Sequence, residues 1–171
     1  MSTHWVFGYG SLIWRPGFEC LHSEPANLQG WHRSLCVLSH KYRGTVDNYG
    51  LVFGLDVGGT CHGLAFEVDD KIWPETYRYL TERELVTHVY LEHQLPITLP
   101  KSRRQVTALT YVVDPRHAQY AGHLSREHKL KLVRNGVGEA GSCMDYVKNT
   151  SSHLHELGIP DRALDDLIQH L

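Results

Sequence analysis

The sequence predicts an α+β fold in which helices cover a mixed sheet or small β-barrel, formed by a single domain over residues 1–171. The chain has 171 residues, a length typical of one domain with one hydrophobic core. Strand-like apolar segments dominate its first half, and helical patterns dominate its last third. Strands that precede helices, rather than alternating with them, favour the α+β class.

The first half contains four short segments with the apolar, β-branched or aromatic composition of strands. They are residues 4–7, 34–39, 51–56 and 61–68. The last two segments flank Val57-Gly58-Gly59-Thr60, and the paired glycines predict a hairpin turn between them.

The periodicity then changes to that of a helix over residues 71–85. Asp69 or Asp70 can cap this helix, and Pro74 lies in its first turn, where a missing N–H costs little. One apolar face is spaced for burial against the core. It consists of Trp73, Tyr77 and Leu80.

The rest of the chain is expected to form two more strands and three more helices. The strands are residues 86–99 and 105–113. The helices are residues 125–134, 142–157 and 161–171. Gly158 and Pro160 end the second of these helices.

Charge and composition exclude several classes of protein. Lys and Arg number 17 against 19 Asp and Glu, a net charge of −2, so the basic surplus of a nucleic-acid binder is missing. No apolar run reaches the length of a membrane span, and the first residues lack the pattern of a signal peptide. The four cysteines form no CxxC pair, which predicts reduced thiols in a cytoplasmic protein.

Histidine is unusually frequent, at 13 residues, and raises the question of a metal site. The densest groups are Cys61-His62, Glu92-His93 and His153-Leu154-His155-Glu156. None has the spacing of HExxH or of a known zinc site. We therefore predict no metal site.

The first candidate functional segment is Phe7-Gly8-Tyr9-Gly10-Ser11-Leu12-Ile13, directly after the first expected strand. Two glycines one residue apart allow a sharp turn and let a ligand approach backbone N–H groups, as in anion-binding loops. The third glycine of a dinucleotide fingerprint and the Lys of a P-loop are missing. On its residues alone, the segment is either an anion-binding loop or a tight turn.

The second candidate is Glu84, which lies four residues beyond Leu80 and so shares the buried face of its helix. Glu82 is expected to face solvent. Burial raises the pKa of a carboxyl group, which suits general acid–base catalysis. The alternatives are a salt bridge of Glu84 with Arg83 or Arg43, or a frayed helix end in water.

The chain also resembles the ChaC-type γ-glutamylcyclotransferases, a family of glutathione-degrading enzymes. The resemblance begins at Trp5-Val6-Phe7-Gly8-Tyr9-Gly10-Ser11-Leu12-Ile13-Trp14-Arg15-Pro16 and spans nearly the whole chain in order. The later matching segments are residues 42–45, 58–66, 79–84, 108–112, 120–122 and 138–147. Two positions depart from the family pattern: His88-Val89-Tyr90 stands where many relatives have Gly-Gly-Tyr, and Cys143 where some have Asn.

The resemblance implies a γ-glutamylcyclotransferase-like fold and a lyase that needs no cofactor and no metal. Its substrate is glutathione, whose own α-amine attacks the γ-carbonyl to release 5-oxoproline and cysteinylglycine. Glu84 corresponds to the catalytic general acid and base of the family. The substrate loop corresponds to Gly8, Tyr9, Gly10, Ser11, Leu12 and Ile13.

Further substrate contacts are expected from residues around this site. Tyr111, Tyr120 and Tyr146 are candidate hydroxyl donors, and Arg43 is expected to pair either with the glycyl carboxylate or with Glu84. His88, four residues after Glu84, is a candidate for tuning its pKa.

Two other functions stay open. A cyclotransferase of this fold can act on other γ-glutamyl amines or amino acids, and a non-catalytic regulator associated with cation transport is a third possibility. Small molecules are the expected partners, with no nucleic acid and no membrane, and the chain is expected to be a monomer or weak dimer.

Overall fold

Five strands close into a barrel in the computed structural model, which describes residues 2–171. Around the barrel the order is β1-β3-β2-β4-β5, and neighbours are antiparallel except β1 and β5. The strands are Thr3–Gly8 (β1), His22–Ser39 (β2), Gly50–Asp69 (β3), Tyr90–Leu99 (β4) and Arg104–Val113 (β5). The expected mixed sheet, closed as a small barrel, is therefore confirmed.

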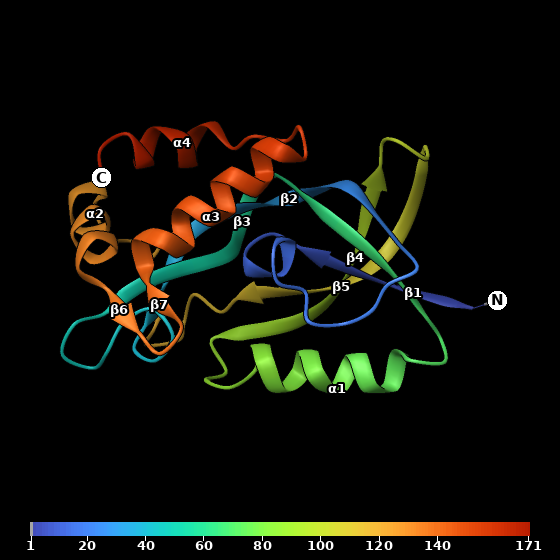
Figure 1. Ribbon diagram of the computed structural model, residues 1–171, viewed down its shortest axis with the longest axis horizontal. Coiled ribbons are helices and arrows are strands. Elements are labelled where there is room, and N and C mark those ends of the chain that lie inside the picture. Colours follow the sequence, from blue (N-terminus) through green and yellow to red (C-terminus); the bar gives the residue numbers. More distant parts are fainter. Residues whose placement is uncertain (1) are drawn as a thin grey trace.

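Helices cover the barrel from two sides: α3 and α4 lie on one side of the strands and α1 on the other (Figure 1). The helical elements are Ser11–Ile13 (η1, a 3-10 turn), Trp73–Glu84 (α1), Arg126–Asn135 (α2), Cys143–Glu156 (α3) and Arg162–Ile168 (α4). A short ribbon of Val137–Gly138 (β6) and Gly141–Ser142 (β7) leads into α3. The expected order of strands first and helices last is confirmed.

The hairpin expected at Gly58-Gly59 is wrong, because β3 runs without interruption through both glycines. Both have positive φ, 103° and 68°, and they lie where the pairing of β2 with β3 shifts register at Gly30. Glycine adopts this backbone conformation without strain. The two glycines form a bulge that bends a long strand, so both halves of β3 pair with the same neighbour.

The last three helices begin as their sequences predict. The side chains of Ser125, Ser142 and Asp161 each accept a hydrogen bond from a backbone N–H in the first turn of α2, α3 and α4. Such caps satisfy donors that have no partner within the helix. The last helix ends at Ile168, three residues before the expected end.

The expected cap of α1 is wrong. Ile72 occupies the cap position and makes no side-chain cap bond. Asp69 accepts from the N–H of Lys71 at 2.8 Å, in the turn before the helix, and Asp70 pairs with His4 at 2.9 Å. Pro74 lies in the first turn, as predicted.

The buried face of α1 also differs from the expected one. Tyr77 is 39% exposed, and its hydroxyl donates to Glu92 at 3.1 Å, whereas Thr76 and Leu80 are buried. The helix is thus rotated so that the edge with Thr76 and Leu80 meets the barrel. Glu84 stays on this face because it lies four residues beyond Leu80.

The strand expected from residue 86 begins only at Tyr90. His88 has a φ of 59°, in the left-handed region that interrupts a strand. Residues 86–89 therefore form a loop between the end of α1 and β4, beside the cavity described below.

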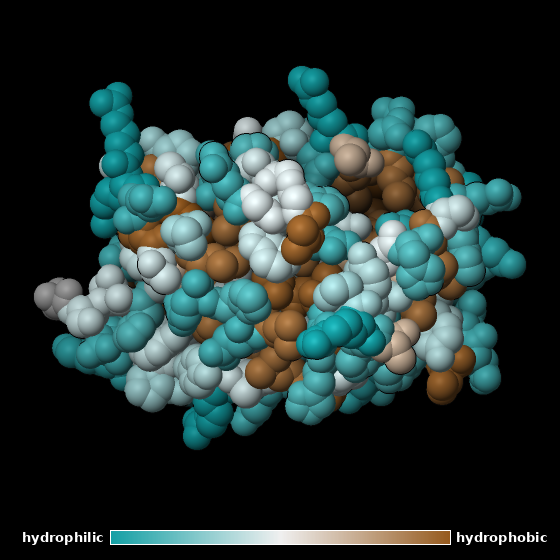
Figure 2. Space-filling model, turned by 180° about the vertical axis from the view of Figure 1, so that it is seen from behind, coloured by the Kyte–Doolittle hydropathy of each residue, from teal (hydrophilic) through white to brown (hydrophobic). Residues whose placement is uncertain are grey.

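Polar side chains cover most of the face shown in Figure 2, with apolar residues mainly in the recesses between them. Within residues 2–171, no helix is both long and apolar enough to cross a membrane.

Candidate active site

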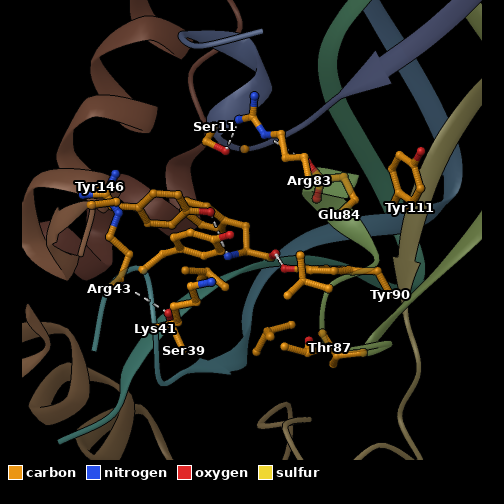
Figure 3. A pocket seen from close by; sticks show the side chains of 18 of the residues that line it. Ser11, Ser39, Lys41, Arg43, Arg83, Glu84, Thr87, Tyr90, Tyr111 and Tyr146 are labelled. Atoms are coloured by element: carbon orange, nitrogen blue, oxygen red, sulfur yellow. Dashed lines mark hydrogen bonds and ion pairs between the residues drawn. The ribbon is translucent and has the colours of Figure 1, made fainter. Parts of the chain in front are cut away.

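A cavity of about 530 Å³ opens where the end of β1, the end of α1 and the first turns of α3 approach one another. Several tyrosines, the buried Phe53 and both charged and apolar side chains line it. Figure 3 shows its charged residues on different walls, with aromatic side chains between them. The barrel brings together residues that are more than 130 positions apart, from Tyr9 to Tyr146.

The loop after β1 presents its backbone to this cavity. Tyr9, Gly10, Ser11 and Leu12 line the cavity, whereas Gly8, at the end of β1, and the buried Ile13 do not. Within residues 2–171, the N–H groups of Gly10, Ser11 and Leu12 make no backbone hydrogen bond. Three successive free donors of this kind can receive an anion.

Gly10 brings the backbone close to the opposite wall. A Cβ at this position would lie 3.3 Å from the hydroxyl oxygen of Tyr146 and 3.6 Å from Phe53. Any larger side chain would therefore press on Tyr146 and fill the space in front of the free N–H groups. The glycine keeps this space open.

Glu84 ends α1 and faces the cavity with a side chain that is 17% exposed. Burial raises the pKa of its carboxyl group above the ordinary value, and the charge of Arg83 offsets part of this rise. The Nε of Arg83 lies 3.3 Å from Oε1 of Glu84. The salt bridge considered from the sequence is therefore present with Arg83, and Glu84 is also a buried group in a cavity.

Arg83 connects Glu84 to the loop after β1. Its guanidinium donates to the carbonyl oxygen of Arg15 at 2.6 Å, to Oγ of Ser11 at 2.8 Å and to the hydroxyl of Tyr79 at 2.9 Å. These bonds hold the end of α1 against the 3-10 turn. The carboxyl group and the free N–H groups therefore share one rigid frame.

The tyrosines of the cavity differ in whether their hydroxyl protons are free. Tyr9 donates to the carbonyl oxygen of Tyr111 at 2.8 Å, and Tyr90 donates to that of Phe53 at 2.6 Å. The hydroxyl of Tyr146 instead accepts from the N–H of Phe53 at 3.1 Å, which leaves its proton free. The buried hydroxyl of Tyr111 has no hydrogen-bond partner within residues 2–171.

Burial raises the pKa of all four phenols, and the charge of Glu84 adds to the effect. They are therefore neutral near pH 7. Tyr111 and Tyr146 both line the cavity, and their role as hydrogen-bond donors to a substrate stays a prediction. Tyr90 also lines the cavity and was not expected there, although the segment His88-Val89-Tyr90 departs from the family pattern.

Arg43 lies in the connection between β2 and β3 and is only 7% exposed. Its guanidinium lies over the rings of Tyr146, at 5.2 Å, and Trp14, at 6.0 Å. Nη1 donates to the carbonyl oxygen of Ser142 at 3.2 Å. It lines the cavity but forms no ion pair with Glu84 within residues 2–171.

Other residues considered from the sequence lie outside the cavity. The hydroxyl of Tyr120 donates to Asp56 at 2.6 Å, and His88 is exposed and does not line the cavity. Cys143 is buried and donates to the carbonyl oxygen of Leu51 at 2.9 Å. Over residues 2–171, no three His, Cys, Asp or Glu side chains are grouped so as to hold a metal ion.

Comparisons with known proteins agree on one family. Residues 4–171 match the family model described as ChaC-like protein. A glutathione-specific γ-glutamylcyclotransferase of Escherichia coli K12 is 32% identical over 96% of this chain and 71% of its own length. The glutathione-specific γ-glutamylcyclotransferase 1 of Danio rerio is 31% identical over 85% of this chain and 76% of its own length.

The fold is also shared with solved structures. A crystal structure of a yeast γ-glutamyl cyclotransferase specific to glutathione superposes with a TM-score of 0.90, covers 99% of this chain and 95% of its own, and is 20% identical. A second solved structure, a γ-glutamyl cyclotransferase, superposes with a TM-score of 0.61 at 14% identity and covers 97% of this chain and 86% of its own.

Proposed function

The chain belongs to the ChaC-like protein family, and from this premise we propose that it is a γ-glutamylcyclotransferase that degrades glutathione. The curated relatives in Escherichia coli, Danio rerio and Schizosaccharomyces pombe carry the name glutathione-specific γ-glutamylcyclotransferase. The match covers most of this chain, including the loop after β1 and the end of α1.

The reaction is an internal acyl transfer within the substrate. The α-amino nitrogen attacks the γ-carbonyl carbon, a five-membered lactam forms, and the bond to the cysteinyl nitrogen breaks. The products are 5-oxoproline and cysteinylglycine. The α-ammonium loses protons in this reaction, and the departing amine gains one.

One observation supports this chemistry above the others: the buried carboxyl of Glu84 faces the same cavity as the free N–H groups of Gly10, Ser11 and Leu12. A base with a raised pKa holds its proton more readily near neutral pH, so it can accept a proton and return it. Glu84 acts first as the base for the α-ammonium and then as the acid for the leaving amine.

The free N–H groups provide the complementary charge. The substrate's α-carboxylate and the oxyanion that develops on the γ-carbonyl are both negative, and preorganised N–H donors stabilise such groups. The free hydroxyl protons of Tyr111 and Tyr146 add two donors on the walls. Donors in fixed positions need no reorganisation during the reaction.

The cavity also favours the reactive shape of the substrate. Internal attack requires the glutamyl chain to fold so that its amine meets its own carbonyl. Pre-organising an internal attack can remove several kcal/mol of the barrier, up to about 7–11 in favourable systems. The rigid frame formed by Arg83, Ser11 and Arg15 holds Glu84 and the loop in place for this task.

The enzyme is proposed to act in the cytoplasm as a monomer or weak dimer, on a small molecule and without cofactor or metal. Cys20, Cys36, Cys61 and Cys143 are free thiols, as expected where glutathione is kept reduced.

The test is to incubate the purified protein with glutathione and EDTA and to quantify 5-oxoproline and cysteinylglycine by mass spectrometry. Glu84→Gln keeps the shape of the side chain but removes the base, and we expect turnover to fall by about 10²–10⁴-fold. Glu75→Gln, at an exposed glutamate in the first turn of the same helix, is the matched control and should keep full activity.

Two results would contradict the proposal. Wild-type turnover of γ-glutamylalanine without turnover of glutathione would assign the protein to the other γ-glutamyl substrates. Full activity of the Glu84→Gln variant would remove Glu84 from the mechanism.

A further inference from the structure

We propose that Arg43 binds the glycyl carboxylate of glutathione, so that the enzyme selects γ-glutamyl substrates by the presence of a negative charge at their far end. This inference rests on the proposed function and assigns a substrate group to the end of the same cavity that lies opposite Glu84. It separates the two partners that the sequence left open for Arg43, the substrate and Glu84.

The first support is a buried cation without a counterion. Within residues 2–171, no carboxylate oxygen lies within 4 Å of the guanidinium of Arg43, a residue that is only 7% exposed. Its side chain makes one hydrogen bond, to Ser142, although a guanidinium carries five N–H donors. An unpaired buried charge is costly unless a partner arrives.

The surroundings of Arg43 offset this cost only in part. Burial lowers the pKa of the guanidinium, while Asp145 attracts it from more than 4 Å and Arg15 repels it. The rings of Tyr146 and Trp14 hold the guanidinium in place through contacts with their faces. A fixed, desolvated and unpaired guanidinium suits a planar carboxylate, to which it can donate two parallel hydrogen bonds.

The second support is the position of Arg43 relative to Glu84. The two side chains lie on opposite sides of the cavity (Figure 3), and Tyr146 is close enough to both for each charge to act on its hydroxyl. Glu84 is instead paired with Arg83. A substrate that reaches from one charge to the other must pass Tyr146.

The chemistry of glutathione then decides which carboxylate goes where. The α-amine and the α-carboxylate are bound to the same carbon, so an amine held at Glu84 keeps the α-carboxylate at that end. The free N–H groups of Gly10, Ser11 and Leu12 are available for it there. The glycyl carboxylate is the other negative group of the tripeptide, and it is the one that can reach Arg43.

The part of the cavity wall near Arg43 carries further positive charge. Lys41 and Arg15 line the same cavity as Arg43 and are exposed at its edge. Positive groups at the edge attract an anionic substrate and lose influence in high salt. Arg43, being buried, provides the oriented contact.

The experiment compares glutathione with its glycyl monoethyl ester, in which the far carboxylate is neutral, and with γ-glutamylcysteine, which lacks the glycine. kcat and KM are measured for the wild type, Arg43→Gln and Arg43→Lys. Arg78→Gln, at an exposed arginine on α1 that does not line the cavity, is the control. Circular dichroism checks that each variant is folded.

We expect the wild type to favour glutathione over the ester by at least tenfold, mostly in KM, because hydrogen bonds to charged groups typically contribute ~1.5–3 kcal/mol. Arg43→Gln should reduce this preference to about one, because the turnover of glutathione should fall more than that of the ester. Arg43→Lys keeps the charge without the planar fork, so its preference should be intermediate. γ-Glutamylcysteine keeps a carboxylate, but this group lies one residue closer to the γ-glutamyl bond. If Arg43 is placed for the glycyl carboxylate, γ-glutamylcysteine should be a poorer substrate than glutathione, and Arg43→Gln should reduce that difference too.

Two outcomes would overturn the inference. One is a wild type that does not distinguish glutathione from its ester. The other is an Arg43→Gln variant that loses activity on both to the same extent, which would indicate a structural role or a contact with the α-carboxylate.

Direct binding of glutathione and of the ester, measured by calorimetry, keeps the test independent of turnover. A wild type that discriminates in binding but releases no 5-oxoproline would support the Arg43 site and refute the proposed reaction.

Discussion

The side chain of Arg33 connects the loop after β1 to α4 through hydrogen bonds, and its removal tests whether these bonds position the loop for substrate binding. The side chain is 3% exposed and extends from β2. It donates to the carbonyl oxygen of Tyr9 at 2.5 Å, to that of His62 at 2.6 Å and to Oδ2 of Asp161 at 2.9 Å. Asp161 also caps α4. One guanidinium therefore joins the loop, the barrel and α4.

Arg33→Met keeps much of the apolar stem and removes every one of these bonds. Removing one member of a buried ion pair costs about 3–5 kcal/mol, because the other charge stays behind. Asp161 is 20% exposed and can recover some hydration, which lowers this figure. The carbonyl groups of Tyr9 and His62 also lose their donor, which raises it. We therefore expect a destabilisation of about 3 kcal/mol.

The same substitution should weaken substrate binding, because the Tyr9 carbonyl precedes the free N–H groups of Gly10 and Ser11. Urea unfolding gives the free energy, and steady-state kinetics give KM and kcat for glutathione. Asp161→Asn keeps a good helix cap but removes the charge, so its KM should stay near that of the wild type. The double variant measures the coupling between the two side chains.

The reasoning would be refuted by an Arg33→Met variant whose unfolding free energy lies within about 0.5 kcal/mol of the wild type, the range of ordinary surface substitutions. An unchanged KM in a clearly destabilised variant would separate the two effects. It would show that Arg33 supports the barrel but does not position the loop.

Two further predictions concern the ionisation of Glu84. Because Arg83 lowers the pKa of Glu84, Arg83→Met should move the acid limb of the kcat/KM profile to higher pH, and Arg83→Lys should move it less. An unmoved limb would show that this ion pair does not set the pKa on which activity depends. Because the folded state raises this pKa, the carboxyl of Glu84 contributes stability below its unfolded pKa of about 4.3 and loses it as pH rises through the folded value. Thermal unfolding from pH 4 to 8 should therefore show Glu84→Gln gaining stability relative to the wild type as pH increases, and the opposite trend would contradict a raised pKa.

Two of the errors in the sequence-based fold share one cause. Gly58-Gly59 has the composition of a hairpin turn, yet β2 is long enough to pair with both halves of β3, and this long-range pairing decides that the glycines bulge. Likewise, both Tyr77 and Thr76 lie at plausible core spacings from Leu80. Only the packing of α1 against the barrel selects the edge that is buried.

Much of the candidate site could be found without the structure. The resemblance identified the loop after β1, Glu84, Tyr111, Tyr146 and Arg43, and the structure places most of these in one cavity. Gly8 and Ile13 belong to the segment that corresponds to the family's substrate loop, but neither of them lines the cavity, and only the three-dimensional course of the loop decides this.

The sequence by itself determined the features that depend on near neighbours. The caps Ser125, Ser142 and Asp161 bind N–H groups three residues away, and Glu84 follows Leu80 by one helical turn. Local geometry governs such contacts, so residue type and spacing suffice to predict them.

Only the tertiary structure decided which distant groups meet. Closure of the barrel sets Arg83 against Ser11 and Arg15, and it buries Arg43 against Tyr146 and Trp14 with no carboxylate oxygen within 4 Å among residues 2–171. The choice of partner for a charge depends on which chain segments are brought within a few ångströms, and on how much water is excluded there. Neither quantity is a local property of the chain, which is why the sequence left the partner of Arg43 open.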